Sequence, residues 1–144
     1  MIKRILVPLD GSQASEAAVL KASDILRGKP DAFIAVLRVL ELPENSPLFE
    51  PVDLANARAE ERRQTSEYLD QLKEEYAAPH YTMETRIEAA EEGVANAIIK
   101  CAETENVDLI VLTSHGRTGL KKLLLGSVTE KVVRLSPCSV MIVK

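Results

Sequence analysis

The stretch LIVLTSHGRTGLKKLLLGSVTEKVVRL, residues 109–135, decides the fold class of this chain. Its first four residues, Leu109 to Leu112, are continuously apolar, which is typical of a strand that is covered on both faces. A loop with three glycines follows, and the segment Ser127 to Leu135 is expected to be a helix. A buried strand, a loop and a helix in this order indicate an α/β domain with a mainly parallel sheet.

The rest of the chain alternates between strand-like and helix-like segments in the same way. The strand around Met83 alternates apolar and polar residues, so it has one wetter face and is expected at a sheet edge. Three prolines between Glu41 and Val52 indicate a long loop. The expected strands are Ile2–Val7, Phe33–Leu40, Tyr81–Ile87, Leu109–Leu112 and Ser139–Val143. The expected helices are one that Ser12 caps, with Ala14, Ala18, Ala22 and Ile25 on one face, then Asp53–Tyr76, then one with Val94, Ala97, Ile98, Cys101 and Ala102 on one face, and finally Ser127–Leu135.

Composition points to one domain. With 144 residues, of which 46% are hydrophobic, the chain is expected to fold as a single domain over residues 1–144 and to bury about 68–70% of the surface that its unfolded form exposes. A net charge of −4 and an aromatic content of 3% argue against nucleic acid as a partner. No run approaches the roughly 18 apolar residues of a membrane helix. The two cysteines, Cys101 and Cys138, lack metal-ligand spacing and are expected to be reduced, so we expect a cytoplasmic protein.

Positive charge gathers toward the C-terminus. Between Ser114 and Lys144 there are six Lys or Arg residues against one acid, Glu130, so this end carries +5 and the remainder −9. Such a run is either a solvated helix face or a site for an anion.

The loop between Thr113 and Ser127 has the composition of a phosphate site. Glycines let the backbone approach an anion closely, and a helix that starts at Gly126-Ser127 directs unpaired N–H groups toward it. Two well-known phosphate motifs, Gly-x-x-x-x-Gly-Lys-Ser/Thr and Gly-x-Gly-x-x-Gly, are absent. Ser127-Val128-Thr129-Glu130 also has the spacing of a capping box, so Ser127 is either a phosphate ligand or a helix cap.

Two loops are expected to meet at one crevice. In parallel α/β sheets, ligands bind beyond the carboxyl ends of the strands where the strand order reverses. If the first and fourth strands are central, the loop Pro8-Leu9-Asp10-Gly11 and the glycine-rich loop both face that point.

With these motifs in view, the chain resembles the universal stress protein family. ATP-binding members of that family carry Gly-x-x-Gly, nine residues, and then Gly-Ser or Gly-Thr. Here Gly116 matches the second glycine, Gly126-Ser127 matches the closing pair after nine residues, and Thr113 stands at the first glycine. The resemblance extends to ILVPLDGS at the start and GSVTEKVVRLSPCSVMIVK at the end, so it covers essentially the whole chain.

The resemblance implies a fold and a ligand. The fold is a three-layer α/β/α sandwich of the adenine nucleotide alpha hydrolase-like type, with a five-stranded parallel sheet in the order 3-2-1-4-5. The ligand is ATP with Mg²⁺ or Mn²⁺, with Asp10 near the ribose or metal, the Val39 backbone at the adenine, and Gly116, Gly126 and Ser127 at the phosphates. The implied nucleotide-binding residues are Pro8, Leu9, Asp10, Val39, Thr113, Ser114, His115, Gly116, Arg117, Gly126, Ser127, Val128 and Thr129, and Asp10 is the implied metal ligand.

Thr113 departs from the ATP-binding pattern. Its Cβ, methyl and hydroxyl either crowd the ribose or phosphate or donate a hydrogen bond. Three hypotheses stay open: an ATP-binding regulatory protein of the stress response, a nucleotide-free dimeric interaction module of the same fold, and a slow nucleotide hydrolase. Asp10 is the only well-placed acid, and a strand-end aspartate is more often a metal ligand or loop cap than a general base, so we predict no catalytic residue.

The last strand, Ser139–Val143, is expected to form a dimer interface. It is short, apolar and last in the sheet, so its outer edge leaves unpaired backbone groups unless something covers it. Members of the family commonly pair this strand with its copy across a twofold axis. We therefore predict a homodimer through Val140 to Val143.

Overall fold

Five parallel strands form one sheet in the order β3-β2-β1-β4-β5, which confirms the predicted order. The computed structural model describes residues 1–41, 51–114 and 125–144, apart from the side chains of residues 51 and 52. The strands are β1 (Arg4–Leu9), β2 (Ala32–Leu40), β3 (Tyr81–Ala89), β4 (Leu109–Thr113) and β5 (Ser139–Val143). The helices are η1 (Gln13–Glu16, 3₁₀), α1 (Ala17–Leu26), α2 (Pro51–Glu75), α3 (Val94–Thr104) and α4 (Ser127–Leu135).

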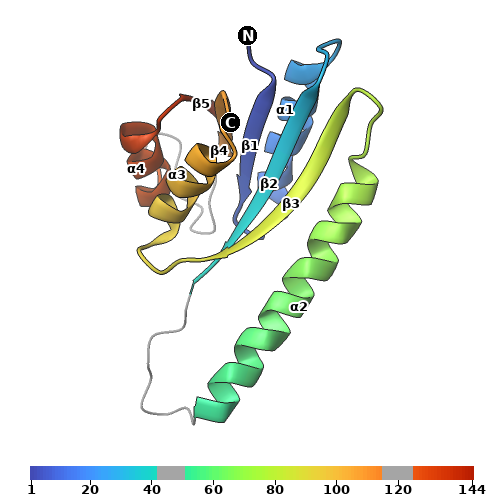
Figure 1. The fold of residues 1–144 in the computed structure, drawn as a ribbon. Helices are drawn as coiled ribbons and strands as arrows, with labels where there is room; N and C mark the ends of the chain where they lie inside the picture. Colours follow the sequence, from blue (N-terminus) through green and yellow to red (C-terminus); the bar gives the residue numbers. More distant parts are fainter. Residues whose placement is uncertain (42–50, 115–124) are drawn as a thin grey trace.

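Helices cover both faces of the sheet, so the chain forms the predicted three layers (Figure 1). On one face, α1 and α2 bury Leu26 and Leu72 against the strands. On the other face, α3 and α4 bury Ile98 and Val132. The strand Tyr81–Ala89 lies at the edge of the sheet, as its alternating pattern predicted.

Side chains of the central strand β1 alternate between these two cores. Ile5 and Val7 belong to the core under α1 and α2, and Leu6 belongs to the core under α3 and α4. All three side chains are fully buried. Because both faces of the strand are covered, its sequence is continuously apolar rather than alternating.

Pro8 lies inside β1, which extends to Leu9 and so runs beyond its predicted end. The Lys3 carbonyl accepts a hydrogen bond of 2.8 Å from β2, and the Arg4 carbonyl accepts one of 2.8 Å from the residue before β4. Odd residues of β1 therefore face β2 and even residues face β4. The missing N–H of Pro8 faces β4, and the pairing of β1 with β4 ends at Leu6, before the proline.

The first helical segment differs from its predicted face. Ser12 caps it as predicted, and its side chain accepts from the backbone N–H of the residue three positions on. The segment begins as the 3₁₀ helix η1, whose tighter turn shifts the buried face of the residues around it. Ala14 is therefore exposed and Ile25 half-buried, whereas Val19 and Leu26 are buried.

The other boundaries lie close to their predicted positions. α4 and β5 have the predicted bounds, and α2 begins two residues before its predicted start. The predicted loop between Glu41 and Val52 lies mostly outside the described residues. Among the helices in the described ranges, none combines the length and the apolar character needed to cross a membrane.

Candidate functional site

A cavity of about 480 Å³ lies at the carboxyl edge of the sheet, where β1 and β4 separate. The strand order reverses between these two strands, and such a point is where open α/β sheets bind ligands. The volume falls within the range of about 300–1,000 Å³ of small-molecule sites. The described lining residues are Pro8, Leu9, Asp10, Ser15, Arg38, Val39, Glu41, Val94, Ile98, Leu112, Thr113, Ser114, Gly126, Ser127, Val128 and Thr129.

The cavity brings together every predicted nucleotide-binding residue that the structure describes. The end of β1 contributes Pro8, Leu9 and Asp10, and the end of β2 contributes Val39. The end of β4 and the start of α4 contribute Thr113, Ser114, Gly126, Ser127, Val128 and Thr129. The end of β1 and the described residues on either side of the range 115–124, which are far apart from β1 in the sequence, thus line one cavity. The remaining predicted residues, His115, Gly116 and Arg117, lie outside the described residues.

The N-terminus of α4 lines the cavity without a side-chain cap. Gly126 is the N-cap residue, in an extended conformation, and its carbonyl accepts from the Glu130 N–H at 2.9 Å. Ser127 begins the helix one residue later and makes no capping bond, so the capping-box interpretation is wrong. Because the first N–H groups of a helix have no intrahelical partner, they are oriented to bind an anion.

Gly126 is not required by the backbone conformation. Its φ is −62°, which any L residue adopts, and a Cβ at this position would meet no described atom within 4 Å. The described packing therefore gives no reason for glycine here. A ligand that approaches the backbone closely would give one.

Asp10 is held in place by the turn that follows β1. Its Oδ1 accepts from the Ser12 backbone N–H at 2.8 Å and from the Ser12 hydroxyl at 2.5 Å. Gly11 between them has a φ of 88°, in the left-handed region that favours glycine. Ser15, which is 2% exposed, donates its hydroxyl to the Ser12 carbonyl at 2.7 Å. Asp10 is thus a loop cap whose carboxylate is presented to the cavity in a fixed orientation.

The carboxylates that line the cavity suit a metal ion that binds together with phosphate groups. In the part of the chain that the structure describes, no three His, Cys, Asp or Glu side chains are grouped to hold a metal ion by themselves. Asp10 and Glu41 are the carboxylates among the described lining residues. A magnesium ion bound with a nucleotide takes one or two carboxylates and the phosphates rather than an all-protein cage. Asp10 therefore fits such an ion as a single protein ligand.

Val39 and Arg38 form a polar contact at the end of β2. Arg38 is the last residue of β2 that pairs with β1, so the sheet gives the next carbonyl, that of Val39, no partner on the β1 side. Arg38 Nη1 donates to this carbonyl at 2.8 Å. Both residues line the cavity.

Thr113 ends β4 at the border of the cavity and is half-buried. It pairs with Val143 of β5. The next residue, Ser114, donates its backbone N–H to the Val143 carbonyl at 3.0 Å. A backbone hydrogen bond therefore joins the end of the site to the end of the outer strand β5.

Sequence reasoning missed several lining residues, namely Ser15, Arg38, Glu41, Val94, Ile98 and Leu112. Arg38 had a visible signal, since it is the one charged residue in the strand AFIAVLRVL. Val94 and Ile98 were assigned to the core face of α3. Only the packing of α3 against the sheet shows that this face also reaches the cavity.

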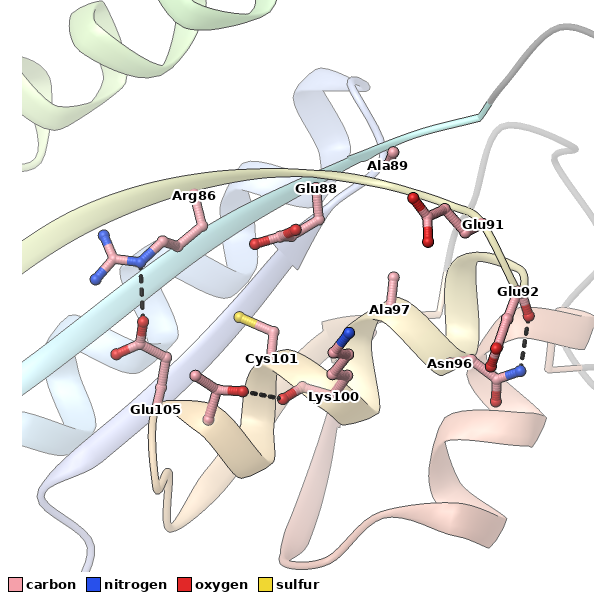
Figure 2. A pocket seen from close by; sticks show the side chains of 11 residues that line it. Arg86, Glu88, Ala89, Glu91, Glu92, Asn96, Ala97, Lys100, Cys101 and Glu105 are labelled. Atoms are coloured by element: carbon pink, nitrogen blue, oxygen red, sulfur yellow. Dashed lines mark hydrogen bonds and ion pairs between the residues drawn. The ribbon is translucent and has the colours of Figure 1, made fainter.

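A second cavity, of about 410 Å³, lies between β3 and α3 (Figure 2). Its charged lining residues are mostly acidic, and its guanidinium, Arg86, already donates to Glu105 at 2.8 Å. The sulfur of Cys101 points toward β3, and burial raises the pKa of this thiol to about 11, so it is not a nucleophile at neutral pH. The charged residues of this cavity are Arg86, Glu88, Glu91, Glu92, Lys100 and Glu105. Their net negative charge disfavours a phosphate ligand.

The whole chain, residues 1–144, matches the Universal stress protein family. Universal stress protein MJ0577 of Methanocaldococcus jannaschii is 34% identical over 162 residues, with 100% of this chain and 96% of the relative covered. Universal stress protein YxiE of Bacillus subtilis is 31% identical over 158 residues, with 100% of both chains covered.

Solved structures have the same fold. The structure of MJ0577 superposes with a TM-score of 0.83 at 31% identity, covering 100% of this chain and 96% of the other. The structure of universal stress protein UspA from Lactobacillus plantarum superposes with a TM-score of 0.84 at 27% identity, covering 99% of this chain and 98% of the other.

Proposed function

The chain belongs to the universal stress protein family, and we propose that it is a homodimeric, ATP-binding regulatory protein of the stress response that acts in the cytoplasm. The observation that carries the nucleotide proposal is the convergence of three features at one cavity. These are the oriented carboxylate of Asp10, the uncapped start of α4, and Gly126, which the described packing does not require.

The start of α4 would hold the phosphates. Its first N–H groups and the positive end of the helix dipole favour an anion. The Ser127 side chain is exposed and takes no part in capping, so its hydroxyl is able to donate to a phosphate oxygen. Gly116 and Arg117, in the same proposed set, follow β4 in the sequence.

The base and ribose would occupy the part of the cavity next to β1 and β2. Apolar side chains there, including Pro8 and Ile98, suit the faces of a purine. The Val39 carbonyl is an acceptor for the adenine amino group, and the Asp10 carboxylate would bind the ribose or hold Mg²⁺ or Mn²⁺. When bound, that ion neutralises phosphate charge.

We propose that occupancy of the site, rather than turnover, is the signal. Asp10 is a carboxylate that lines the cavity at the end of β1, and its Oδ1 already accepts from Ser12. A base must reach the proton that it removes, and this geometry favours positioning by Asp10 over proton transfer. Slow hydrolysis remains the alternative within the same cavity.

Retained nucleotide is the direct test of this function. Gently purified protein is examined by native mass spectrometry, and the nucleotide-free protein is titrated with ATP and Mg²⁺ by calorimetry. We expect one ATP per chain. A concentration of 1 mM ATP would detect binding as weak as about −4.1 kcal/mol. If no nucleotide is retained and 1 mM ATP produces neither heat nor thermal stabilisation, the nucleotide-free interaction module becomes the better description.

The homodimer would form through the open edge of β5. Because the Val143 carbonyl is bonded to β4, odd residues of β5 face β4, and the N–H groups of Val140 and Ile142 face the open edge. On the neighbouring helix α4, two apolar side chains are exposed, Val133 at 46% and Leu135 at 47%. Ile142→Pro would remove an edge donor without removing a β4 bond.

Light scattering at micromolar concentration tests the dimer. Wild type is expected to be dimeric and Ile142→Pro monomeric. Thr85→Pro is the matched control, because odd residues of β3 face the other open edge of the sheet. A monomeric wild type, or equal dimerisation of all three proteins, contradicts the proposal.

A further inference from the structure

A tyrosine of helix α2 is hydrogen-bonded to the short helix η1, which follows the Asp10 turn. Tyr68 donates its hydroxyl to Glu16 Oε1 at 2.8 Å, between residues 52 positions apart in the sequence. Both side chains are half-buried, and Tyr68 packs against the core under α1 and α2. Burial, together with the hydrogen bond to Glu16, raises the pKa of Tyr68, so the phenol stays protonated and acts as the donor at neutral pH.

This contact ties η1 to α2. Glu16 is the last residue of η1 and the N-cap residue of α1, where its side chain makes no capping bond. A single turn of 3₁₀ helix has poor hydrogen-bond geometry, so it depends on outside contacts to keep its position. Within the described ranges, no other side chain of η1 is hydrogen-bonded to a segment remote in sequence. The Tyr68 hydroxyl is therefore the polar contact that holds η1 against α2.

Hydrogen bonds continue from η1 to the cavity. Ser12 Oγ accepts from the Ser15 N–H at 3.3 Å and donates to Asp10 Oδ1 at 2.5 Å. Because the same hydroxyl makes both bonds, a displacement of η1 changes the bond that the carboxylate receives. Ser15 and Asp10 both line the cavity, whereas Tyr68 is not among its described lining residues. The orientation of the Asp10 carboxylate thus depends on a contact outside the cavity.

We propose that Tyr68 is a positioning residue of the cavity, which acts through Glu16 and η1 to orient the Asp10 carboxylate. The effect of Tyr68 on ligand affinity rests on the proposed nucleotide-binding function. Its effect on the geometry of the turn does not, so the two are measured separately.

Nuclear magnetic resonance of the full-length protein without nucleotide tests the geometry of the turn. The Ser12 backbone N–H donates to Asp10 Oδ1 at 2.8 Å, so the chemical shift of its proton reports on that hydrogen bond. Tyr68→Phe removes the hydroxyl and keeps the ring, and Glu16→Gln removes the charge of the acceptor. We expect both variants to move the Ser12 amide resonance in the same direction, because both weaken the same contact.

Tyr76→Phe is the matched control. Tyr76 is half-buried and packs against the same core, but its hydroxyl has no hydrogen-bond partner among the described residues. This variant should leave the Ser12 amide resonance at its wild-type position. Thermal melts check that each variant is folded.

Calorimetry with ATP and Mg²⁺ tests the consequence for binding. Tyr68→Phe should raise the dissociation constant by about threefold or more, because the carboxylate is no longer held in its orientation. In the Asp10→Asn background the same change should have less than about a twofold effect, since the charged group that Tyr68 orients is gone. A tyrosine that contributed only to stability would leave both dissociation constants unchanged.

The outcomes separate this inference from the proposed function. A Ser12 resonance that stays in place in both Tyr68→Phe and Glu16→Gln overturns the inference and leaves ATP binding intact. Wild-type ATP affinity in folded Tyr68→Phe, or an equal loss of affinity with and without the Asp10 carboxylate, also overturns the positioning role. If wild type binds no ATP, the proposed function fails, and the Ser12 resonance alone decides whether Tyr68 sets the geometry of the turn.

Discussion

Ser127→Ala separates ligand binding from folding at the start of α4. Ser127 is exposed, lines the cavity and begins the helix, while Gly126 is the N-cap residue. A serine that caps a helix contributes about 0.5–2 kcal/mol of stability. Since Ser127 does not cap, its replacement should change the free energy of unfolding by less than about 0.5 kcal/mol.

The effect on ATP affinity should be much larger. A hydrogen bond from the Ser127 hydroxyl to a charged phosphate is worth about 1.5–3 kcal/mol. Its loss in Ser127→Ala should therefore raise the dissociation constant for ATP by about tenfold to hundredfold. Calorimetric titration with ATP and Mg²⁺ measures the affinity, and chemical denaturation without ligand measures the stability. Ser66→Ala, an exposed serine on α2 outside this cavity, is the matched control and should change neither quantity.

Two results would refute this reasoning. Wild-type ATP affinity in Ser127→Ala would show that the hydroxyl does not contact phosphate. A loss of more than about 1 kcal/mol of stability without ligand would show that Ser127 contributes to the helix start after all.

The other predictions concern four further positions. Gly126→Val should abolish most ATP binding, because a branched side chain blocks close approach of a phosphate, yet retain the fold, since φ is −62° and no described atom lies within 4 Å of the Cβ; calorimetry and melts measure both. Thr113→Gly should tighten ATP binding if the side chain crowds the ligand, at a cost of about 0.5–1 kcal/mol for glycine in a strand; unchanged or weaker affinity would mean that threonine is tolerated or donates a hydrogen bond. Hydrogen bonds from the backbone N–H groups of Lys3 and the next residue lower the pKa of Asp108. The ionised carboxylate therefore stabilises the fold above its unfolded pKa, and this stability is lost as the pH falls through the folded pKa. Asp108→Asn should destabilise the protein at pH 7, and the difference in stability from wild type should shrink below about pH 4. Cys101, whose buried thiol has a pKa of about 11, should resist alkylation at pH 8 in the native protein and react on unfolding, which peptide mass spectrometry measures; rapid native alkylation would contradict its burial.

Much of the site was accessible from sequence because its residues lie at the ends of strands. A run such as Leu109–Leu112 must be buried, and the polar or glycine residues after it must lie at the carboxyl edge. The same reasoning applied to the residues after Val7 identified Asp10. The resemblance to the family supplied the strand order, which no local pattern contains, and the structure confirms it.

The predictions for Pro8 and Ser127 were wrong for a reason that lies outside the local sequence pattern. Pro8 was read as a loop residue, although the proline is tolerated in β1 because its missing N–H faces the gap next to β4. Ser127 had the spacing of a cap, but spacing does not say which of two neighbouring residues takes the N-cap conformation, and Gly126 takes it. The first outcome depends on where the pairing of β1 with β4 ends, and the second on the residue at which α4 begins.

The sequence by itself determined which segments are strands and which are helices, because burial on one or both faces produces a characteristic spacing of apolar residues. It also located the carboxyl ends of β1 and β4 to within about one or two residues. Only the tertiary structure decided that α3 contributes Val94 and Ile98 to the cavity and that Arg38 donates to the Val39 carbonyl. These features depend on distances between segments that are remote in sequence, or on a carbonyl left unpaired where an adjacent strand stops, and local composition records neither.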